Sequence, residues 1–301
     1  MYNINEILVC LDLSAIDKSV IHYASFINSI ISPRNIYFIY VGKEPDNNKE
    51  LAEAERKNSK LQIEKSIKSE FKKAGKAVIN IEVRDGSPIH EVLNFAKDKD
   101  IELIVVGKKK EENGSGILSE KIARKSPCSV LFIPEQPPLK LEEILLPTDF
   151  SEYSKLAFEE VRVFIKKIDY LLTVFALHIY DVPIGYYTTG KSYEEFAGIM
   201  KDNAKKDYKR FLHEIKCEDL KIKPNFVLDE DRKSNASQIM EFAIKKKCDL
   251  IMIGAKGHSN ASAMLLGSTT EKLLRQNDSI PLMVLKRKGE TLNFLEALLK
   301  L

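Results

Sequence analysis

Short runs of consecutive apolar residues alternate along the chain with longer segments in which apolar residues recur every three or four positions. Runs such as ILVCL, LIVV, LLTVFAL and LIMI have no polar face, which is typical of parallel strands covered by helices on both sides. The longer segments have the periodicity of amphipathic helices. The pattern therefore predicts an α/β fold in which strands and helices alternate.

Each half of the chain contains five predicted strands and four predicted helices. In the first half we expect strands at 5–11, 35–41, 77–84, 102–106 and 129–133, and helices at about 16–31, 49–75, 87–99 and 117–125. In the second half we expect strands at 143–147, 171–179, 221–228, 249–253 and 281–285, and helices at about 152–168, 191–218, 234–247 and 268–276. This order predicts two tandem doubly wound domains, each with a five-stranded parallel sheet.

An internal repeat supports the two-domain organisation. EILVCLDLS at 6–14 recurs as EILLPTDFS at 143–151, and IELIVVG at 101–107 recurs as CDLIMIG at 248–254. The matches keep their order, so the sequence predicts a duplication of one unit of about 140 residues. The predicted domains span 1–137 and 138–289, and a C-terminal helical tail spans 290–301.

Composition and charge exclude several classes of protein. The chain has 301 residues, of which 44% are hydrophobic and 30% are charged, with a net charge of +3. Such a balance is typical of globular proteins and lacks the basic excess of a nucleic-acid-binding domain. No apolar run reaches the ~18–20 residues of a membrane-spanning helix, and the start does not resemble a signal peptide. The four cysteines form no CxxC motif and are predicted to be small buried residues in a reduced, cytoplasmic protein.

The most informative candidate chemistry follows the fourth strand of the second half. Ligands of open parallel sheets bind beyond the carboxyl ends of the strands. Gly254 is expected to let a ligand approach the backbone, and Gly257 to allow a turn with positive φ. Gly267, Ser268 and Thr269 open a helix whose N–H groups and hydroxyls suit a phosphate. In the alternative interpretation, the glycines serve only turns, and Ser268 or Thr269 only caps the helix.

A second candidate group follows the first strand of the same half. There, the carboxylate of Asp149, next to Thr148, suits hydrogen bonds from ribose hydroxyls or from the amino group of a base. Alternatively, Asp149 or Ser151 only caps the next helix. His178 is expected to pack within its strand, and His258 to face solvent.

The order PTDFS, LHIYD, LIMIGAKGHSNASAMLLGSTTEKLL and IPLMVLK resembles the universal stress protein family. Members with bound ATP share the pattern Gly-x2-Gly-x9-Gly-Ser/Thr, and Gly254, Gly257, Gly267 and Ser268 match it. The resemblance extends over both halves, roughly 3–288, so the chain looks like a tandem universal stress protein.

The resemblance implies a Rossmann-like, adenine nucleotide alpha hydrolase-like fold and specific roles for the candidate residues. Thr148 and Asp149 would meet the adenosine part of ATP, with Ile179 and Ile253 beside the adenine. The residues that would surround the ribose and phosphates are Gly254, Gly257, Gly267, Ser268 and Thr269. Mg²⁺ is a common companion of ATP, although no acidic cluster in the sequence predicts a dedicated metal site. No catalytic residues are expected, and slow ATP hydrolysis is left open.

The first half departs from this pattern. Lys110 takes the position of Gly257, the loop is shorter, and Ile117 replaces Ser268, although Asp12 stays. This half is therefore expected to be a scaffold that does not bind ATP, with a Gly114-Ser115-Gly116 segment left open as a site for a small anion. In the family, two such domains commonly associate through their fifth strands, so we expect them to pair within the chain, and a homodimer is left open.

The leading hypothesis is a stress-response regulatory protein that binds ATP, or another adenine nucleotide, in the second domain. The alternative is a structural or protein-interaction module that binds no nucleotide. A Rossmann dehydrogenase is rejected, because the segments after the two first strands, 10–16 and 147–153, contain no glycine for a GxGxxG turn.

Overall fold

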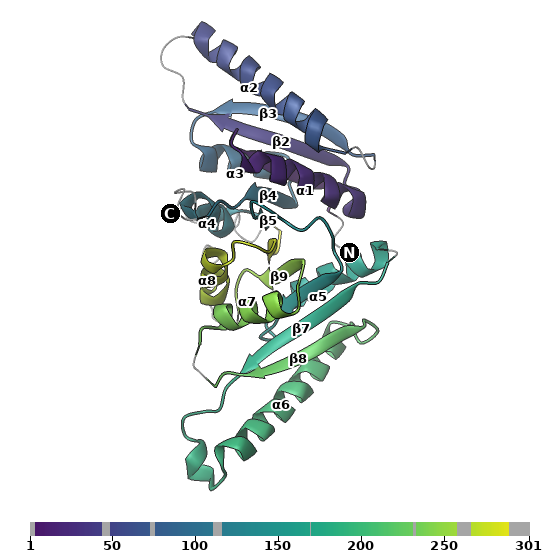
Figure 1. Ribbon diagram of the computed structural model, residues 1–301, viewed down its shortest axis with the longest axis vertical. Helices are drawn as coiled ribbons and strands as arrows, with labels where there is room; N and C mark the ends of the chain where they lie inside the picture. Colours follow the sequence, from purple (N-terminus) through teal and green to yellow (C-terminus); the bar gives the residue numbers. More distant parts are fainter. Residues whose placement is uncertain are drawn as a thin grey trace. The chain divides into compact units, whose positions relative to one another are not determined.

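A computed structural model describes most of the chain, and its contacts divide it into two compact units (Figure 1). The described residues are 4–43, 49–72, 76–110, 116–168, 170–230, 233–257 and 266–288. Within these ranges, the first unit takes the residues up to Leu139, together with Leu266 and the segment from Asp278 onward. The second unit takes the residues from Lys140 to 257 and from Gly267 to Asn277.

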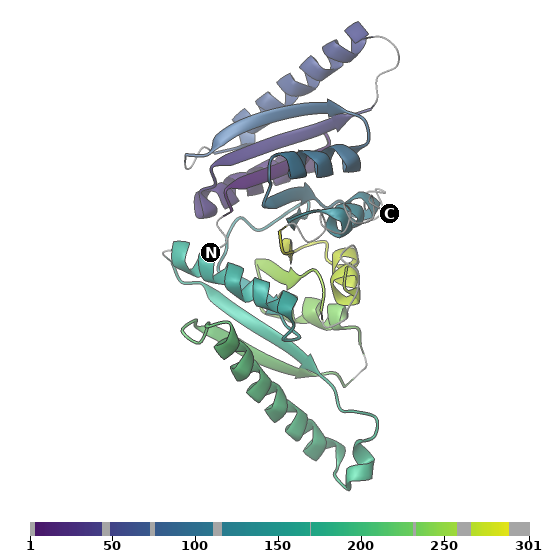
Figure 2. The same ribbon diagram turned by 180° about the vertical axis from the view of Figure 1, so that it is seen from behind.

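The first unit is an α/β structure built on a mostly parallel sheet. Its elements are β1 (Glu6–Leu11), α1 (Ile16–Ile31), β2 (Asn35–Gly42), α2 (Lys49–Glu70), β3 (Val78–Asp85), α3 (Pro88–Asp98), β4 (Leu103–Gly107), α4 (Gly116–Lys125), β5 (Ser129–Ile133) and β10 (Leu282–Leu285). The strand order is β3-β2-β1-β4-β5-β10, and only the β5–β10 pair among these is antiparallel. The helices α1 and α2 contact each other on one face and α3 and α4 on the other, as the views from the front and from behind show (Figure 2).

The second unit repeats this plan. Its elements are β6 (Glu143–Pro147), α5 (Glu152–Lys167), β7 (Thr173–Tyr180), the short 3₁₀ helix η2 (Tyr186–Thr189), α6 (Tyr193–Glu214), β8 (Ile222–Leu228), α7 (Asn235–Lys245), β9 (Leu250–Gly254) and α8 (Ser268–Gln276). The strand order is β9-β6-β7-β8, with all three pairs parallel. The order reverses between β6 and β9, which is where open sheets of this kind bind ligands.

The predicted α/β class and its doubly wound, mostly parallel sheets are confirmed, and the ten predicted strands and the eight predicted helices before residue 290 are present. The strand predicted as the fifth of the second half, β10, groups instead with the first unit, where it pairs antiparallel with β5. Helix starts follow local chemistry: the hydroxyl of Ser192 accepts a hydrogen bond from the N–H of Glu195, whose carboxylate bonds back to the Ser192 N–H. The predicted helix at 191–218 is shorter, because α6 ends at Glu214 and Lys216 adopts a positive φ of 52°. The sequence did not predict η2. The domain boundaries at 137 and 138 stay a prediction, and the tail at 290–301 lies outside the described residues.

Buried strands form the core of each unit. All five residues of β9 are buried, as its uninterrupted apolar sequence predicted. Cys128, Cys217 and Cys248 are buried free thiols and Cys10 is half-buried. Burial raises the pKa of Cys128 and of Cys248 to about 12, so both thiols stay protonated at neutral pH.

The strand β10 is held in the first unit by strand pairing with β5 and by hydrogen bonds from the residue that follows the strand. Leu282 pairs with Phe132 of β5. Lys286, which follows the strand and is buried, donates from Nζ to the carbonyl oxygens of Arg124 at 2.9 Å and Ser126 at 3.1 Å. These carbonyls belong to the C-terminal end of α4, where a cation is favoured by the helix dipole.

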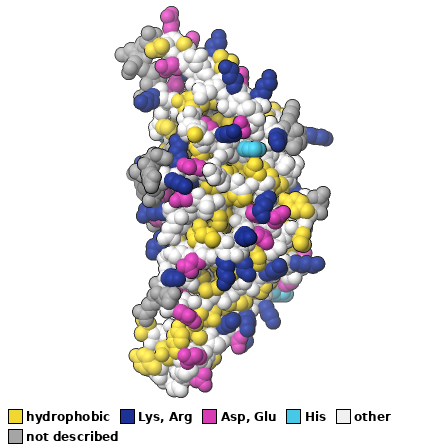
Figure 3. All heavy atoms as spheres, viewed as in Figure 1, with side chains coloured by type: hydrophobic (Ala, Val, Ile, Leu, Met, Phe, Trp, Pro, Cys, Tyr) yellow, Lys and Arg dark blue, Asp and Glu magenta, His cyan; other side chains and the backbone are white. Residues whose placement is uncertain are grey.

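The surface mixes charges of both signs. On the face in Figure 3, Lys and Arg side chains are interspersed with Asp and Glu side chains. Across the described part of the chain, no helix combines the length and the apolar composition that crossing a membrane requires.

Candidate functional site

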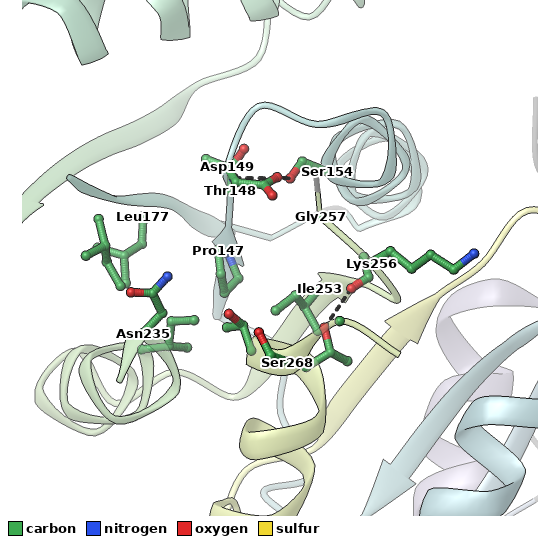
Figure 4. Close-up of a pocket in the computed structure, with 16 residues that line it drawn as sticks. Pro147, Thr148, Asp149, Ser154, Leu177, Asn235, Ile253, Lys256, Gly257 and Ser268 are labelled. Carbon is green, nitrogen blue, oxygen red and sulfur yellow. Dashed lines mark hydrogen bonds between the residues drawn. The ribbon is translucent and has the colours of Figure 1, made fainter. Parts of the chain in front are cut away.

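A pocket of about 240 Å³ lies at the carboxyl ends of the second unit's strands, around the point where the strand order reverses (Figure 4). All nine residues that the sequence predicts for the site line this pocket: Thr148, Asp149, Ile179, Ile253, Gly254, Gly257, Gly267, Ser268 and Thr269. The lining also contains seven residues that the prediction missed: Pro147, Ser154, Leu177, Asn235, Ile239, Lys256 and Thr270.

The turn between β6 and α5 fixes the carboxylate of the pocket. The Oδ1 atom of Asp149 accepts hydrogen bonds from the Oγ of Ser154 at 2.8 Å and from the N–H of Ser151 at 3.1 Å. Ser151 is the N-cap of α5, since its hydroxyl accepts from the N–H of Ser154. Ser151 therefore caps the helix, and Asp149 is held in a fixed orientation at the pocket wall.

An aromatic stack supports this turn from outside the pocket. Phe150, directly after Asp149, has a positive φ of 64°. Its ring stacks on His178 with the ring centroids 4.3 Å apart, and Nδ1 of His178 lies 2.9 Å from the carbonyl oxygen of Thr148. The stack stabilises a backbone conformation that a bulky residue rarely adopts. His178 thus has the packing role that the sequence predicted.

The structure shows close tertiary contacts at two glycines of the site and corrects the backbone conformation expected for one of them. A β-carbon at Gly254 would lie 2.7 Å from Cβ of Tyr153, so the glycine is needed for close packing of α5 on β9. Gly254 also lines the pocket, and its role toward a ligand stays a prediction. Gly257 does not have the positive φ that we expected. A β-carbon there would collide with the Asp149 carboxylate, so this carboxylate would have to move. Both glycines thus lie where a β-carbon would meet a neighbouring side chain.

The N-terminus of α8 opens into the pocket without a side-chain cap. Gly267 is the N-cap residue, and its own N–H donates to the carbonyl oxygen of Ala255 at 2.8 Å. Thr270, in the first turn, donates from Oγ1 to the carbonyl oxygen of Gly254 at 2.9 Å. These two hydrogen bonds fix the start of α8 against the end of β9. Ser268 and Thr269 are therefore helical residues that line the pocket, not caps.

The charged groups of the pocket are few. Among the described residues that line it, Asp149 and Lys256 are the titratable ones. The side chain of Lys256 runs away from the other lining side chains (Figure 4), and its Nζ lies 5.3 Å from the centre of the Tyr153 ring. Within the described residues, no group of three or more His, Cys, Asp or Glu side chains could hold a metal ion. Binding of an anion here would depend on backbone N–H groups and hydroxyls.

The pocket at the corresponding position of the first unit is smaller than that of the second unit and is lined by different charged residues. A pocket of about 100 Å³ is lined by Asp12, Asp17 and Lys109 among others. Nζ of Lys109 lies 2.5 Å from Oδ2 of Asp12, the counterpart of Asp149. Although burial acts to raise it, the pKa of Asp12 is lowered by the hydrogen bond and charge of Lys109. Asp17 replaces Ser154, and burial raises its pKa to about 6.

Several sequence expectations fall on residues outside the described part of the chain. They concern His258 and the rest of the loop at 258–265, and Gly114 and Ser115 in the first half. Among the missed pocket residues, Asn235 and Ile239 had a usable signal. They are four residues apart, so they lie on one face of a predicted helix whose start follows a strand end.

Comparisons with known proteins give the family. The family model described as Universal stress protein family matches residues 3–134 and 140–286. Universal stress protein MJ0577 of Methanocaldococcus jannaschii is 30% identical over 163 residues, which cover 49% of this chain and 96% of that protein. Universal stress protein MJ0531 of the same organism is 30% identical over 148 residues, or 48% of this chain and 82% of that protein.

A solved structure that covers most of this chain shows the same fold. A universal stress protein from Archaeoglobus fulgidus covers 95% of this chain and 100% of its own length, with a TM-score of 0.69 at 18% identity. The structure of the universal stress protein from Archaeoglobus fulgidus in complex with dAMP covers 44% of this chain and 99% of its own, with a TM-score of 0.30 at 18% identity. The chain, matched twice in tandem by the family model, belongs to the universal stress protein family.

Proposed function

We propose that this protein is a cytoplasmic stress-response regulator that binds ATP, or another adenine nucleotide, in the pocket of its second domain. The observation that carries the proposal is the uncapped start of α8, which meets Gly257 and Asp149 in one pocket. The first domain, spanning 1–137, would be a partner that binds no nucleotide, paired with the second domain, 138–289, within the chain. A homodimer of such chains remains compatible with this proposal.

The start of α8 is suited to the phosphates. The first-turn N–H groups of a helix have no partner within the helix, and the helix dipole makes this end attractive to anions. Gly267 supplies no side chain that would occupy these groups, and Ser268 and Thr269 add hydroxyls at the pocket wall. In this proposal ATP supplies a triphosphate, and the N–H groups and hydroxyls of Ser268 and Thr269 bind its terminal phosphates, because the Gly267 N–H is already bonded to Ala255.

The other end of the pocket is suited to adenosine. Pro147, Leu177, Ile179 and Ile253 present apolar surface on which a flat base can lie. Oδ1 of Asp149 is occupied by Ser154 and Ser151, so the carboxylate keeps a fixed orientation for a ribose hydroxyl. A Mg²⁺ ion would be held by the phosphates and water, which is usual for this ion.

We expect binding without rapid turnover. Asp149, the one carboxylate among the described lining residues, is held by two hydrogen bonds in the turn that carries the adenosine contacts. Phosphate release slower than about one turnover per minute, far below the ~1–10³ s⁻¹ of typical enzymes, is the expected result. A faster steady rate from purified protein would contradict the proposal.

The proposal is tested by calorimetric titration of the full chain with ATP and by mass spectrometry of nucleotide released on denaturation. The expected result is one adenine nucleotide per chain. Two equal sites would contradict the part assigned to the first domain. No binding below millimolar ATP would overturn the proposal and favour the alternative of an interaction module.

A further inference from the structure

Asn235 brings a polar side chain to an apolar part of the pocket. It is the first residue of α7, and its amide lies beside Leu177 and Pro147 (Figure 4). Ile239, one helical turn further on, also lines the pocket. The same wall continues with Ile179 of β7. The amide thus brings hydrogen-bonding atoms to the part of the pocket where these apolar residues lie.

The side chain of Asn235 neither caps α7 nor forms a hydrogen bond within the described residues. A polar residue at a helix start often caps the helix. In α7 this role belongs to Ser234, whose hydroxyl accepts a hydrogen bond from the N–H of Ser237 at 3.3 Å. Within the described residues, the side chain of Asn235 makes no hydrogen bond or ion pair, and the residue is exposed. Its donor and its acceptor are therefore both available to a ligand.

The pocket has two ends, which sets the direction of a bound nucleotide. Figure 4 shows Asn235 and Leu177 on one side of the pocket and Gly257 and Lys256 on the other. The phosphates belong at the start of α8, near Gly267. A base placed on the apolar wall then presents one polar edge to Asn235.

An amide matches the polar edge of adenine. Its carbonyl accepts one hydrogen bond and its NH₂ group donates. Adenine carries a donor, the 6-amino group, next to an acceptor ring nitrogen, and asparagine pairs with this arrangement through two hydrogen bonds. Guanine carries a carbonyl oxygen in place of the 6-amino group. A carboxylate only accepts, so it suits the N–H groups of guanine and not the ring nitrogen of adenine.

We infer that Asn235 reads the base of the bound nucleotide, accepting a hydrogen bond from the 6-amino group of adenine and donating to the neighbouring ring nitrogen. The inference rests on the proposed function, because it requires a nucleotide in this pocket. It adds a specificity residue on α7 to proposed contacts that otherwise come from β7, from the ends of β6 and β9 with the turns that follow them, and from the start of α8.

The test measures affinities of the full chain for ATP, GTP and the triphosphate of purine riboside, which lacks the 6-amino group. The wild type should prefer ATP to purine riboside triphosphate by about tenfold, within the range of one good bidentate contact. Asn235→Leu should bring that ratio close to one. Asn235→Asp should shift the ratio of ATP to GTP affinity at least about tenfold toward GTP.

Asn203→Asp is the matched control, because Asn203 is exposed on α6 and does not line the pocket. This variant should keep the wild-type ratios, and circular dichroism should show that all three variants fold. Unchanged ratios in both Asn235 variants, with ATP still bound, would overturn the inference and leave the proposed function standing. A wild type that binds no nucleotide would overturn both.

Discussion

The carboxylate of Asp149 lies so close to Gly257 that a β-carbon at position 257 would collide with its Oδ2 atom. Gly257→Ala should therefore displace the carboxylate, break its hydrogen bond with Ser154 and narrow the pocket. We expect the affinity for ATP to fall about tenfold or more, as for the loss of a charged hydrogen bond. Calorimetric titration measures this change.

The control for this variant is Gly198→Ala, because a β-carbon at Gly198 in α6 meets no atom within 4 Å. It should bind ATP like the wild type. Wild-type affinity in Gly257→Ala as well would show that the contact with Asp149 does not shape the site.

A carboxylate at the start of α8 should block the phosphate end. Gly267→Asp would cap the helix with its own side chain and repel a phosphate, so ATP affinity should fall about tenfold or more. Adenosine, which has no phosphate, should bind as before. Calorimetry with both ligands measures the difference.

Gly267→Ala separates charge from bulk, because its β-carbon alone lies 3.3 Å from Cα of Lys256. This variant should lose far less ATP affinity than Gly267→Asp. Equal losses in the two variants, or an equal loss for adenosine, would argue against phosphate binding at this helix.

Asp17 should make the first unit less stable as pH rises. Burial raises its pKa from 3.8 to about 6, so the folded state favours the protonated form. The stabilising contribution is complete below the unfolded pKa and is lost as pH rises through about 6. Relative to the wild type, Asp17→Ser should therefore gain up to about 2–3 kcal/mol in the free energy of unfolding between pH ~3.5 and ~7. Urea denaturation at both pH values measures it.

Asp12 has a lowered pKa and an opposite pH dependence, but it is present in both proteins and its contribution largely cancels. A difference between wild type and Asp17→Ser that stays constant with pH would refute the assignment to Asp17.

Removing the ammonium group of Lys286 should destabilise the first unit. Lys286→Met would leave the carbonyl oxygens of Arg124 and Ser126 without this donor, at a cost of about 1–3 kcal/mol in the free energy of unfolding. Lys288→Met is the control, because Lys288 forms a partly exposed ion pair with Asp100 and should cost less than about 1 kcal/mol. Equal effects on urea denaturation would contradict the role of Lys286.

The sequence predicted the elements well because their signals are local. The apolar runs of β4 and β9 and the helical periodicity of α1 and α5 need no knowledge of distant residues. The nine candidate residues also lie in one pocket. The sequence could identify this site because the segment from Gly254 to Ser268 and the turn that contains Asp149 each lie at the end of a predicted strand.

What the sequence did not predict depends on contacts between distant segments. The reasons for Gly254 and Gly257 lie in Tyr153 and Asp149, about a hundred residues earlier in the chain. Asn235 comes from a helix that the glycine pattern does not include, and the strand order brings the start of that helix to the pocket. The ion pair of Lys109 with Asp12 likewise joins two loops that no local pattern connects.

The place of β10 in the first unit has a consequence for synthesis of the protein. β5 ends at Ile133, and its partner β10 begins at Leu282. During synthesis, β10 therefore leaves the ribosome about 150 residues after β5. At ~5–20 residues per second, this delay lasts about 8–30 s. During that time the edge of β5 is open to other chains, as any unpaired strand is. Completion of β10 therefore ends a period of vulnerability, and chains that stop before it should depend most on chaperones.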